Sequence, residues 1–360
     1  MRLGILAPFF DDKPRGIGKS AGFLIRELSK LEGDFEILSP IIPKGANAEK
    51  FKTIPLSLAP ARGRWGNIRR FLWQNFYLAG KYKYLFSTSY ESSLLYLGNQ
   101  GLIIHDVINL KFKEFRYPPL VNYYYRVQTP FVLKFGAKII SPSNFVKNEV
   151  LEAYKMKEED VGVVYWGIDL ENYKPIRNLE VLKKFNLEDR GYILYVGDLI
   201  KRKNVPLVIR ALTKIKDLDF VIAGTIFEKV KIEILNLAEN LGVKDRVKLL
   251  GYVSEEELKI LYSHCYVFVY PSLMEGFGMP PIEAAACGVP VIVSDIPVFR
   301  ELYSGYFIFV DPNDPEDLAD KVQKLNGETL IKNYSELFKK YTWENSAMTL
   351  YGYLKKWGFL

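Results

Sequence analysis

Short apolar runs alternate with stretches of helical apolar spacing, and glycine or proline separates them. Near the N-terminus, residues 3–9 and 35–38 are strand-like runs, and residues 21–31 between them repeat apolar side chains at helical intervals. The same order recurs later, where a strand-like run at 192–196 is followed by helical spacing at about 205–212. Strands that alternate with helices are typical of parallel α/β sheets. The pattern therefore predicts two Rossmann-like α/β units.

The densest pattern of this kind lies in the second half of the chain. An apolar run at 266–270 leads into a loop with Gly276 and Gly278, and a helical stretch ends at Gly288 before another apolar run at 291–294. The helix can begin at two consecutive prolines, since proline suits the first helical turn. Such a loop aims backbone N–H groups and the positive end of a helix at an anion. This stretch therefore predicts a phosphate site.

Two carboxylates bracket this loop. Glu275 precedes it, and Glu283 is expected in the first turn of the following helix. Carboxylates beside a phosphate suit a ligand that also carries hydroxyls, such as a ribose or a hexose. The alternatives are that Glu283 only complements the helix dipole and that Glu275 is a solvated loop residue. Each glutamate taken alone leaves these alternatives open.

Together these residues resemble a known motif. The segments 275–280 (EGFGMP), 283–284 (EA) and 288–291 (GVPV) are similar to the E-x7-E region of retaining glycosyltransferases of family four. That family has the GT-B fold, in which two Rossmann-like α/β domains with parallel sheets face each other across a cleft. The resemblance implies that Glu275 binds donor-sugar hydroxyls and Glu283 the ribose. It also implies that the backbone N–H groups of Gly276, Phe277, Gly278 and Met279 meet the diphosphate.

A cluster of cations follows the strand at 192–196. Lys201, Arg202 and Lys203 precede a helix, and guanidinium and ammonium groups at such a place suit a diphosphate. The resemblance puts Lys203 at the family's diphosphate-binding lysine. Many relatives carry arginine where this chain has Asp198, so Arg202 is expected to take over that role. The alternative is a solvated basic turn.

Several glycines and one tyrosine at strand ends complete the predicted donor site. Gly197 turns the chain after its strand, and the resemblance places Gly224 and Tyr252 beside the nucleotide base. Near the N-terminus, Gly16 and Gly18 resemble the family's glycine loop, which faces donor and acceptor phosphates. The alternative for that loop is a tight strand–helix turn.

A histidine marks the end of another predicted strand. His105 and Asp106 follow the apolar run at 101–104, and active sites of α/β proteins form at such strand ends. The resemblance places His105 beside the reacting sugar, whereas the alternative is a structural His–Asp pair. Relatives usually carry Pro-Asn-Gly at 165–167, where this chain has Tyr-Trp-Gly, so the contacts of Trp166 depart from the family pattern.

The domain boundary is expected in a linker around 166–176. We predict an N-terminal acceptor-side domain at 1–170 and a C-terminal sugar-nucleotide-binding domain at 171–340. A last helix at about 341–360 is predicted to pack back on the first domain.

A basic, aromatic segment at 61–84 allows two interpretations. Ile68, Leu72 and Phe76, with the neighbouring Phe71 and Leu78, can line one side of a helix that has Arg69 and Arg70 at its margin. We expect this stripe to pack in the core with a basic rim, because apolar stripes at helical spacing usually do. The alternative is a basic amphipathic helix that lies on an anionic membrane. Nucleic acid is not expected, since no recognised binding motif accompanies the charge.

Charge is distributed unevenly along the chain. The net charge is +7, and residues 1–174 contain 25 lysines and arginines against 17 aspartates and glutamates. The basic half suggests an anionic partner, and peripheral contact with an anionic membrane is one option. The first residues resemble a strand rather than a signal peptide, and no apolar run is as long as a membrane span. We therefore expect a cytoplasmic protein, with the inner membrane face as a second location.

Metal and redox chemistry are not expected. Two cysteines give no disulfide framework, and two histidines exclude a His-rich metal site. Asp217 and Asp219 spell the D-x-D motif of a different glycosyltransferase fold, but a surface turn before a strand is the better interpretation. We predict no metal and no cofactor besides the donor.

The resemblance implies a retaining, metal-independent hexosyltransferase. The donor is expected to be GDP-mannose or UDP-glucose, with a mannosyltransferase-like relative as the nearest type. The acceptor is expected to be a glycan, a lipid-linked molecule or a small molecule. The alternative is a catalytically silent subunit that binds sugar nucleotides.

Overall fold

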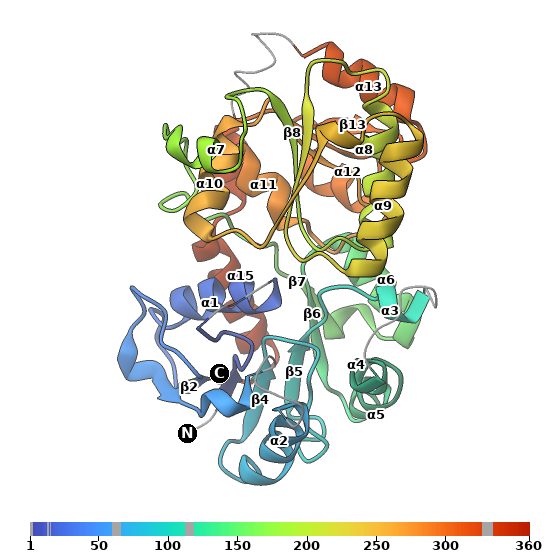
Figure 1. Ribbon diagram of the computed structural model, residues 1–360. Helices are drawn as coiled ribbons and strands as arrows, with labels where there is room; N and C mark the ends of the chain where they lie inside the picture. The colour runs from blue at the N-terminus through green and yellow to red at the C-terminus, as the bar shows by residue number, and fades with distance from the viewer. Residues whose placement is uncertain (1–2, 13, 15, 60–65, 112–118, 326–333) are drawn as a thin grey trace. The chain divides into compact units, whose positions relative to one another are not determined.

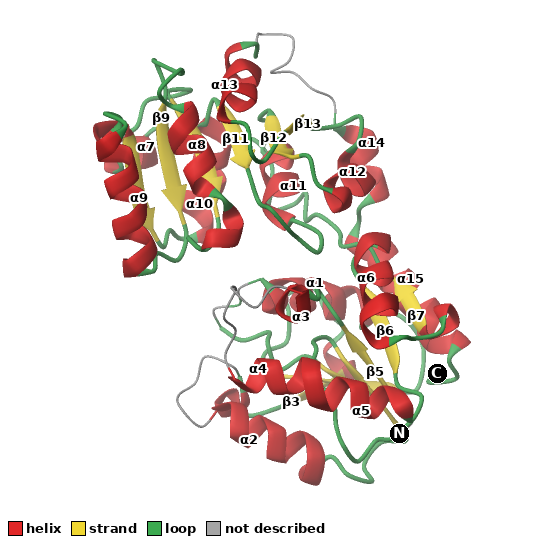
Figure 2. Ribbon diagram, turned by 90° about the vertical axis from the view of Figure 1, so that its right-hand side faces the viewer, coloured by secondary structure: helices red, strands yellow, loops and turns green. Residues whose placement is uncertain are grey.

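The computed structural model describes residues 3–12, 14, 16–59, 66–111, 119–325 and 334–360. The chain divides into two compact units, Met1–Gly167 with Tyr341–Leu360, and Ile168–Lys340. In each unit, helices flank a parallel sheet (Figures 1 and 2). The last helix, α15 (Trp343–Lys356), belongs to the first unit, where the Trp343 ring stacks on Phe23 at 5.3 Å.

The first unit contains a seven-stranded parallel sheet in the order β3-β2-β1-β4-β5-β6-β7. The order reverses between β1 and β4, which are hydrogen-bonded neighbours with Leu3 opposite Tyr84. The expected first strand at 3–9 ends earlier, at Leu6. The strands are β1 (Leu3–Leu6), β2 (Phe35–Ser39), β3 (Phe51–Thr53), β4 (Tyr84–Ser87), β5 (Gln100–Ile103), β6 (Lys138–Ser141) and β7 (Val161–Val163).

The helices of this unit follow from local signals in the sequence. Ser143 begins α6 by accepting a hydrogen bond from the Val146 N–H at 3.2 Å, which is the N-cap role that serine favours. Besides α15, the α-helices are α1 (Ile17–Leu28), α2 (Gly66–Leu72), α3 (Ile108–Lys111), α4 (Pro119–Tyr123), α5 (Thr129–Lys134) and α6 (Asn144–Tyr154). Short helical turns are η1 (Ala48–Lys50), η2 (Leu56–Leu58), η3 (Trp73–Tyr77), η4 (Tyr124–Gln128) and η5 (Glu158–Asp160).

The second unit contains a six-stranded parallel sheet in the order β10-β9-β8-β11-β12-β13. Its strands are β8 (Tyr192–Val196), β9 (Asp219–Ala223), β10 (Val247–Gly251), β11 (Val267–Tyr270), β12 (Val291–Ser294) and β13 (Ile308–Val310). The helices are α7 (Glu180–Lys184), η6 (Lys201–Lys203), α8 (Val205–Ala211), α9 (Glu228–Asn240), η7 (Lys244–Arg246), α10 (Glu255–His264), α11 (Met279–Ala286), α12 (Pro297–Tyr303), α13 (Pro315–Gln323) and α14 (Ser335–Lys340). All residues of β11 and β12 are buried, as expected for strands covered on both faces.

In the basic, aromatic segment at 61–84, the side of the helix that faces the core is not the one that we expected. Its first residues, 61–65, lie outside the described residues. In α2 and η3, Ile68, Leu72 and Phe76 are 46%, 48% and 68% exposed, whereas Arg70 is only 2% exposed. The prediction of core packing was therefore wrong for these three residues, whereas Leu78 of the same predicted stripe is buried. The arginine points inward and the apolar stripe points outward.

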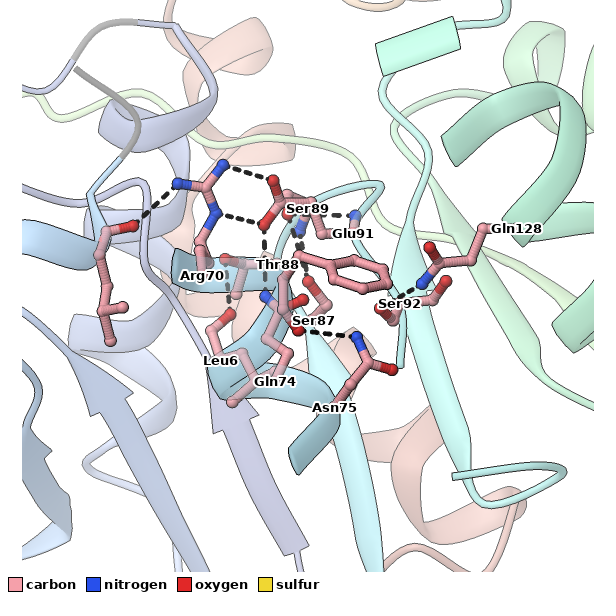
Figure 3. Close-up of polar contacts among 12 residues, drawn as sticks. Leu6, Arg70, Gln74, Asn75, Ser87, Thr88, Ser89, Glu91, Ser92 and Gln128 are labelled. Carbon is pink, nitrogen blue, oxygen red and sulfur yellow. Dashed lines mark hydrogen bonds and ion pairs between the residues drawn. The ribbon is translucent and has the colours of Figure 1, made fainter. Parts of the chain in front are cut away.

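A buried ion pair explains this orientation. Arg70 Nε and Nη2 donate to the two carboxylate oxygens of Glu91, each at 2.6 Å, and Nη1 donates to the Leu58 carbonyl at 2.8 Å (Figure 3). Gln74, one helical turn further on, donates to Glu91 at 3.2 Å. Burial by itself would lower the pKa of Arg70, but Glu91 outweighs it and raises the pKa. The helix therefore turns its charged side toward Glu91.

No helix within the described ranges combines the length and the apolar character needed to cross a membrane.

Candidate active site

In the second unit, the candidate site lies where the strand order reverses. Strands β8 and β11 are neighbours, although β9 and β10 come between them in sequence. The connections that leave β8 and β11 run to opposite sides, and ligands of open α/β sheets bind in the crevice that this leaves at the carboxyl ends of the strands. Lys203 follows β8 and Glu275 follows β11. The topology therefore brings these two side chains to one point.

The cations after β8 are fixed by a short helical turn. Residues Lys201–Lys203 form η6, and Asn204 ends it in the left-handed region with φ 53°. Asparagine tolerates this conformation better than most residues. The Asn204 side chain donates to the Pro312 carbonyl at 2.7 Å, which ties the turn to a distant loop.

Three charged side chains form the centre of the site. Glu275 Oε1 accepts from Lys203 Nζ at 2.6 Å and from Arg202 Nη1 at 2.8 Å. Lys203 also donates to the hydroxyl of Tyr270, the last residue of β11. We call Arg202, Lys203 and Glu275 the charged triad. The triad brings together the cations that were predicted to bind the diphosphate and the carboxylate that was predicted to bind the sugar.

Lys203 and Glu275 are buried and the Arg202 side chain is only 12% exposed, so these charges act strongly on one another. Burial by itself would raise the pKa of Glu275, but Arg202 and Lys203 outweigh it and lower the pKa to about 2. Burial lowers the pKa of the Lys203 ammonium, although Glu275 opposes this shift. Two cations share one oxygen of Glu275, and the Asp198 carboxylate also acts on Lys203.

Burial also excludes the simpler alternatives for these residues. Glu275 is 8% exposed and Lys203 is 7% exposed. Glu275 is therefore not a solvated loop residue, and Lys203 does not belong to a solvated turn. Their roles toward a donor remain predictions.

The glycine loop leads directly into α11. Gly278 precedes the helix with φ 88°, a conformation that glycine adopts without strain. A Cβ atom at this position would lie 2.7 Å from a ring atom of Phe299, so the loop also has no room for a side chain. Tyr303 donates to the Gly278 carbonyl at 2.9 Å and braces the loop from α12. The backbone from Gly276 to Met279 thus has one supported path.

Glu283 lies further along α11 than expected. The helix begins at Met279, so Glu283 is in its second turn and not in its first. Its side chain is buried, and Oε2 accepts from the Tyr262 hydroxyl of α10 at 3.2 Å. The dipole alternative required a place in the first turn and is therefore not supported.

The remaining donor-site candidates lie at the carboxyl ends of β8, β9 and β10. Gly197 and Gly224 have φ 149° and 139°, and a Cβ atom on Gly224 would lie 2.2 Å from the Gly197 carbonyl oxygen. These two glycines therefore allow two strand ends to approach closely. Tyr252 follows β10 and is 74% exposed.

In the first unit, His105 follows β5 and is oriented by a neighbouring strand end. Its Nε2 lies 3.2 Å from the Thr88 carbonyl oxygen, and Thr88 in turn donates its N–H and its hydroxyl to the Leu6 carbonyl. A carbonyl only accepts, so Nε2 carries the proton and Nδ1 keeps a lone pair. Burial lowers the pKa of His105 to about 4, so the ring is neutral at pH 7.

An aromatic ring packs beside this histidine, and the residue after it, Asp106, binds the start of the next helix. The Trp166 ring lies 5.6 Å from the His105 ring, so the residue that departs from the family pattern packs on the candidate catalytic histidine. The Asp106 carboxylate accepts from the Ile108 N–H at 3.1 Å, at the start of α3.

The lowered pKa of His105 predicts a pH-dependent stability. Between about pH 6.5 and pH 4 the unfolded chain binds a proton at this residue that the folded chain does not bind. The neutral, buried His105 therefore contributes its full stabilisation above pH 6.5. The free energy of unfolding falls by up to about 3 kcal/mol as the pH falls through that window. Urea denaturation at several pH values should show a smaller decline for His105→Asn than for the wild type. Equal declines would contradict the assignment.

The backbone geometry explains the two N-terminal glycines, Gly16 and Gly18, separately. Gly16 precedes α1 with φ 39°, and Gly18 lies within that helix. A Cβ atom on Gly18 would lie 2.1 Å from the Phe9 carbonyl oxygen, so only glycine fits there. The tight-turn alternative accounts for this geometry, and a role toward phosphates stays a prediction.

The sequence missed the tyrosines that support the triad and Glu283. Tyr270 contacts Lys203, and Tyr262 contacts Glu283. A tyrosine that ends an otherwise apolar buried strand was a usable signal for Tyr270, because a buried hydroxyl needs a partner. Thr88 was also missed, and no spacing in the sequence pointed to it.

Within the part of the chain that the structure describes, no three His, Cys, Asp or Glu side chains gather as a metal site requires. Independence from metal stays a proposal.

Comparison with known proteins places the chain among glycosyltransferases. Residues 179–341 match the family described as Glycosyl transferases group 1. The O-antigen chain mannosyltransferase RfbU of Salmonella typhimurium is 31% identical over 254 residues, which cover 69% of this chain and 67% of that protein. O-antigen chain mannosyltransferase B of Escherichia coli is 28% identical over 222 residues, which cover 58% of this chain and 57% of that protein.

Solved structures agree over almost the whole length of the chain. HepE of Anabaena, crystallised with UDP and glucose, has a TM-score of 0.74 and 15% identity, and the match covers 99% of this chain and 100% of that one. Sucrose-phosphate synthase of Thermosynechococcus elongatus has a TM-score of 0.75 and 19% identity, with 99% of both chains covered. These likenesses confirm the expected GT-B fold. The match over residues 179–341 and the identity to RfbU establish that the chain belongs to the glycosyl transferases group 1 family.

Proposed function

We propose that the chain transfers a hexose from a nucleotide-diphosphate sugar to a glycan, lipid-linked or small-molecule acceptor, with retention and without a metal. The charged triad at the reversal point of the second sheet carries this proposal. Buried cations beside a glycine loop and a helix N-terminus suit a diphosphate leaving group. The donor would be GDP-mannose or UDP-glucose.

The leaving group would be stabilised by preorganised positive charge. Arg202 and Lys203 would bind the diphosphate oxygens, and the N–H groups from Gly276 to Met279 would add fixed dipoles. Because these donors are already held by the fold, little reorganisation is needed as negative charge develops. A metal ion would not be required for this step.

Glu275 would exchange partners when the donor binds. Both cations now donate to the same oxygen, Oε1. Some N–H groups of Arg202 and Lys203 would then donate to diphosphate oxygens. The Glu275 carboxylate would thereby keep lone pairs free to accept hydrogen bonds from sugar hydroxyls. The triad thus supplies a way to couple binding of the diphosphate to orientation of the sugar.

The nucleoside would lie along the remaining strand ends. Glu283 would bind the ribose, with Gly197, Gly224 and Tyr252 near the base. The similar fold of HepE, which was crystallised with UDP and glucose, supports a sugar-nucleotide donor. The O-antigen mannosyltransferases among the relatives support mannose as the transferred sugar.

His105 would act as a hydrogen-bond acceptor toward the sugar. Its neutral ring carries a proton on Nε2, so the free Nδ1 lone pair would accept from a hydroxyl near the anomeric carbon. Gly16 and Gly18 would let the backbone approach donor and acceptor phosphates.

The electrostatics of Glu275 disfavour a covalent sugar intermediate on its carboxylate. A carboxylate that is bound by two cations and has a pKa of about 2 is a weak nucleophile. The resemblance to retaining glycosyltransferases implies retention, and without a nucleophile on the opposite face we propose that the acceptor attacks from the face that the diphosphate leaves. Incubation with GDP-mannose or UDP-glucose and a candidate acceptor in EDTA, followed by NMR of the anomeric proton, tests this. An inverted product would contradict the mechanism.

Lys203→Ala should weaken binding of the nucleoside diphosphate by about 10–100-fold, because a charge-assisted bond to a buried ammonium is lost. Binding of the nucleoside alone should not change. The matched control is Lys201→Ala, which removes the exposed lysine of the same turn. Calorimetric titration of all three proteins checks this. Equal losses for diphosphate and nucleoside would contradict the assigned role.

A catalytically silent sugar-nucleotide-binding subunit is the second candidate. Asp198, an acid where many relatives carry arginine, favours it by reducing the positive charge near the triad. Nucleotide binding without turnover of any donor would support this alternative.

The two cysteines are buried and free, which suits the reducing cytoplasm as the proposed location.

A further inference from the structure

The first unit exposes a band of apolar side chains on α2 and η3. Ile68, Leu72, Phe76 and Tyr77 are between 46% and 68% exposed. Large apolar residues that are scattered singly on a surface need no explanation, whereas a continuous group of them marks a contact surface. This band follows one side of a single helical segment.

The orientation of this band is fixed by the core beneath it. Arg70 and Gln74 lie on the opposite side of the segment and bind the buried Glu91 (Figure 3). The Asn75 side chain also accepts from the Leu94 N–H at 2.6 Å. Turning the apolar side inward would leave Glu91 buried without its arginine, which is strongly unfavourable. Exposure of the apolar side is therefore built into the fold.

Neighbouring elements extend the band into one surface. The loop around Leu94 binds η3 through Asn75 on one side, and on the other side Gln128 donates to the Ser92 carbonyl at 2.7 Å. A hollow of about 530 Å³ lies between Leu94 and α5. In both overall views, α2 and α5 lie side by side (Figures 1 and 2). Exposed apolar residues of the loop and of η4–α5 join the band, namely Leu95, Leu97, Val127, Phe131 and Phe135.

The segments that form this surface carry charge of one sign, although Glu152 and Asp160 line a neighbouring hollow together with Arg126 and Lys134. The segments 66–83 and 119–138 contain arginine and lysine but no aspartate or glutamate, and the segment 93–99 contains no charged residue. Exposed cations among them are Arg69, Lys81, Lys83, Arg126 and Lys134. An apolar band with cations at its margin is complementary to a lipid surface with anionic headgroups. Two copies of this surface would repel each other.

We propose that the surface formed by α2, η3, the loop around Leu94 and η4–α5 docks on an anionic bilayer. The apolar side chains enter the headgroup region, and the cations at the margin bind lipid phosphates. Docking requires neither the sugar donor nor the acceptor. Membrane docking can therefore fail while the proposed sugar transfer holds, and sugar transfer can fail while docking holds.

The test is co-sedimentation of the full chain with vesicles of phosphatidylcholine alone or with added phosphatidylglycerol, at low and high salt. We expect binding that requires phosphatidylglycerol and weakens with salt. Phe76→Ser with Phe131→Ser should reduce vesicle binding at least about tenfold, because the variant removes two exposed aromatic rings that would be buried in the bilayer. Both positions are exposed, so the fold should persist, and circular dichroism checks this.

The matched control is Phe227→Ser with Ile232→Ser, which changes two apolar residues of similar exposure in the second unit. It should leave vesicle binding within about twofold of the wild type, since surface substitutions away from a contact have small effects. Equal losses in both double variants would overturn the proposal, as would binding to phosphatidylcholine alone that ignores salt. Loss of a dimer in light scattering, without any vesicle binding, would assign the surface to a second copy and would also overturn it.

Discussion

Glu275→Gln should lower kcat for sugar transfer by about 10²–10³-fold while the protein still binds the nucleoside diphosphate. Glutamine keeps the shape of the side chain but removes the carboxylate that would orient the donor sugar, and one such contact in a buried site has an effect of this size. Removing a negative charge next to Arg202 and Lys203 leaves more positive charge for the diphosphate. Its affinity should therefore stay the same or increase.

Initial-rate kinetics and calorimetric titration together measure this separation of turnover from binding. Glu228→Gln is the control, because Glu228 is an exposed glutamate of α9 in the same unit. A kcat within threefold of the wild type would contradict the role of Glu275. A parallel loss of diphosphate affinity would show instead that Glu275 mainly maintains the site.

Arg70→Met should lower the free energy of unfolding by about 3–5 kcal/mol, because it leaves the Glu91 carboxylate buried without its partner. The neighbouring Arg69 is exposed, so Arg69→Met should change stability by less than about 0.5 kcal/mol. Urea denaturation of both variants measures the difference. The comparison is sharp because the two residues are adjacent and chemically identical.

The double variant Arg70→Met with Glu91→Leu separates the charge from the packing. Replacing both members of a buried pair with apolar groups is often close to neutral, so this variant should recover much of the lost stability. A double variant as unstable as Arg70→Met alone would show that packing around α2, and not the unpaired charge, determines the effect. Loss of vesicle binding in Arg70→Met would further link the ion pair to the exposed band.

Local features of the sequence predicted much of the second unit. The strand at Val291–Ser294 has the expected bounds, and Gly278 and Gly288 lie where the glycine loop and the helix end were expected. These features depend on near neighbours, such as proline at a helix start and glycine at a positive φ. The start of α11 shows the limit, because the helix begins at Met279, before its prolines, which moves Glu283 into the second turn.

Contacts between distant residues could not be predicted in this way. Lys203 and Glu275 are 72 residues apart, and they meet because β8 and β11 are neighbours in the sheet. Helical spacing likewise showed that Ile68, Leu72 and Phe76 share one side, but it could not show which side faces the core. That choice depends on Glu91, which is 21 residues from Arg70.

The most direct test of the account is calorimetric titration of the protein with GDP, UDP, ADP and TDP in the presence of EDTA. We predict micromolar binding of one of them, and the base that binds would identify the donor. No binding of any nucleotide, or binding that appears only when a divalent metal is added, would contradict a metal-independent sugar-nucleotide site at the charged triad.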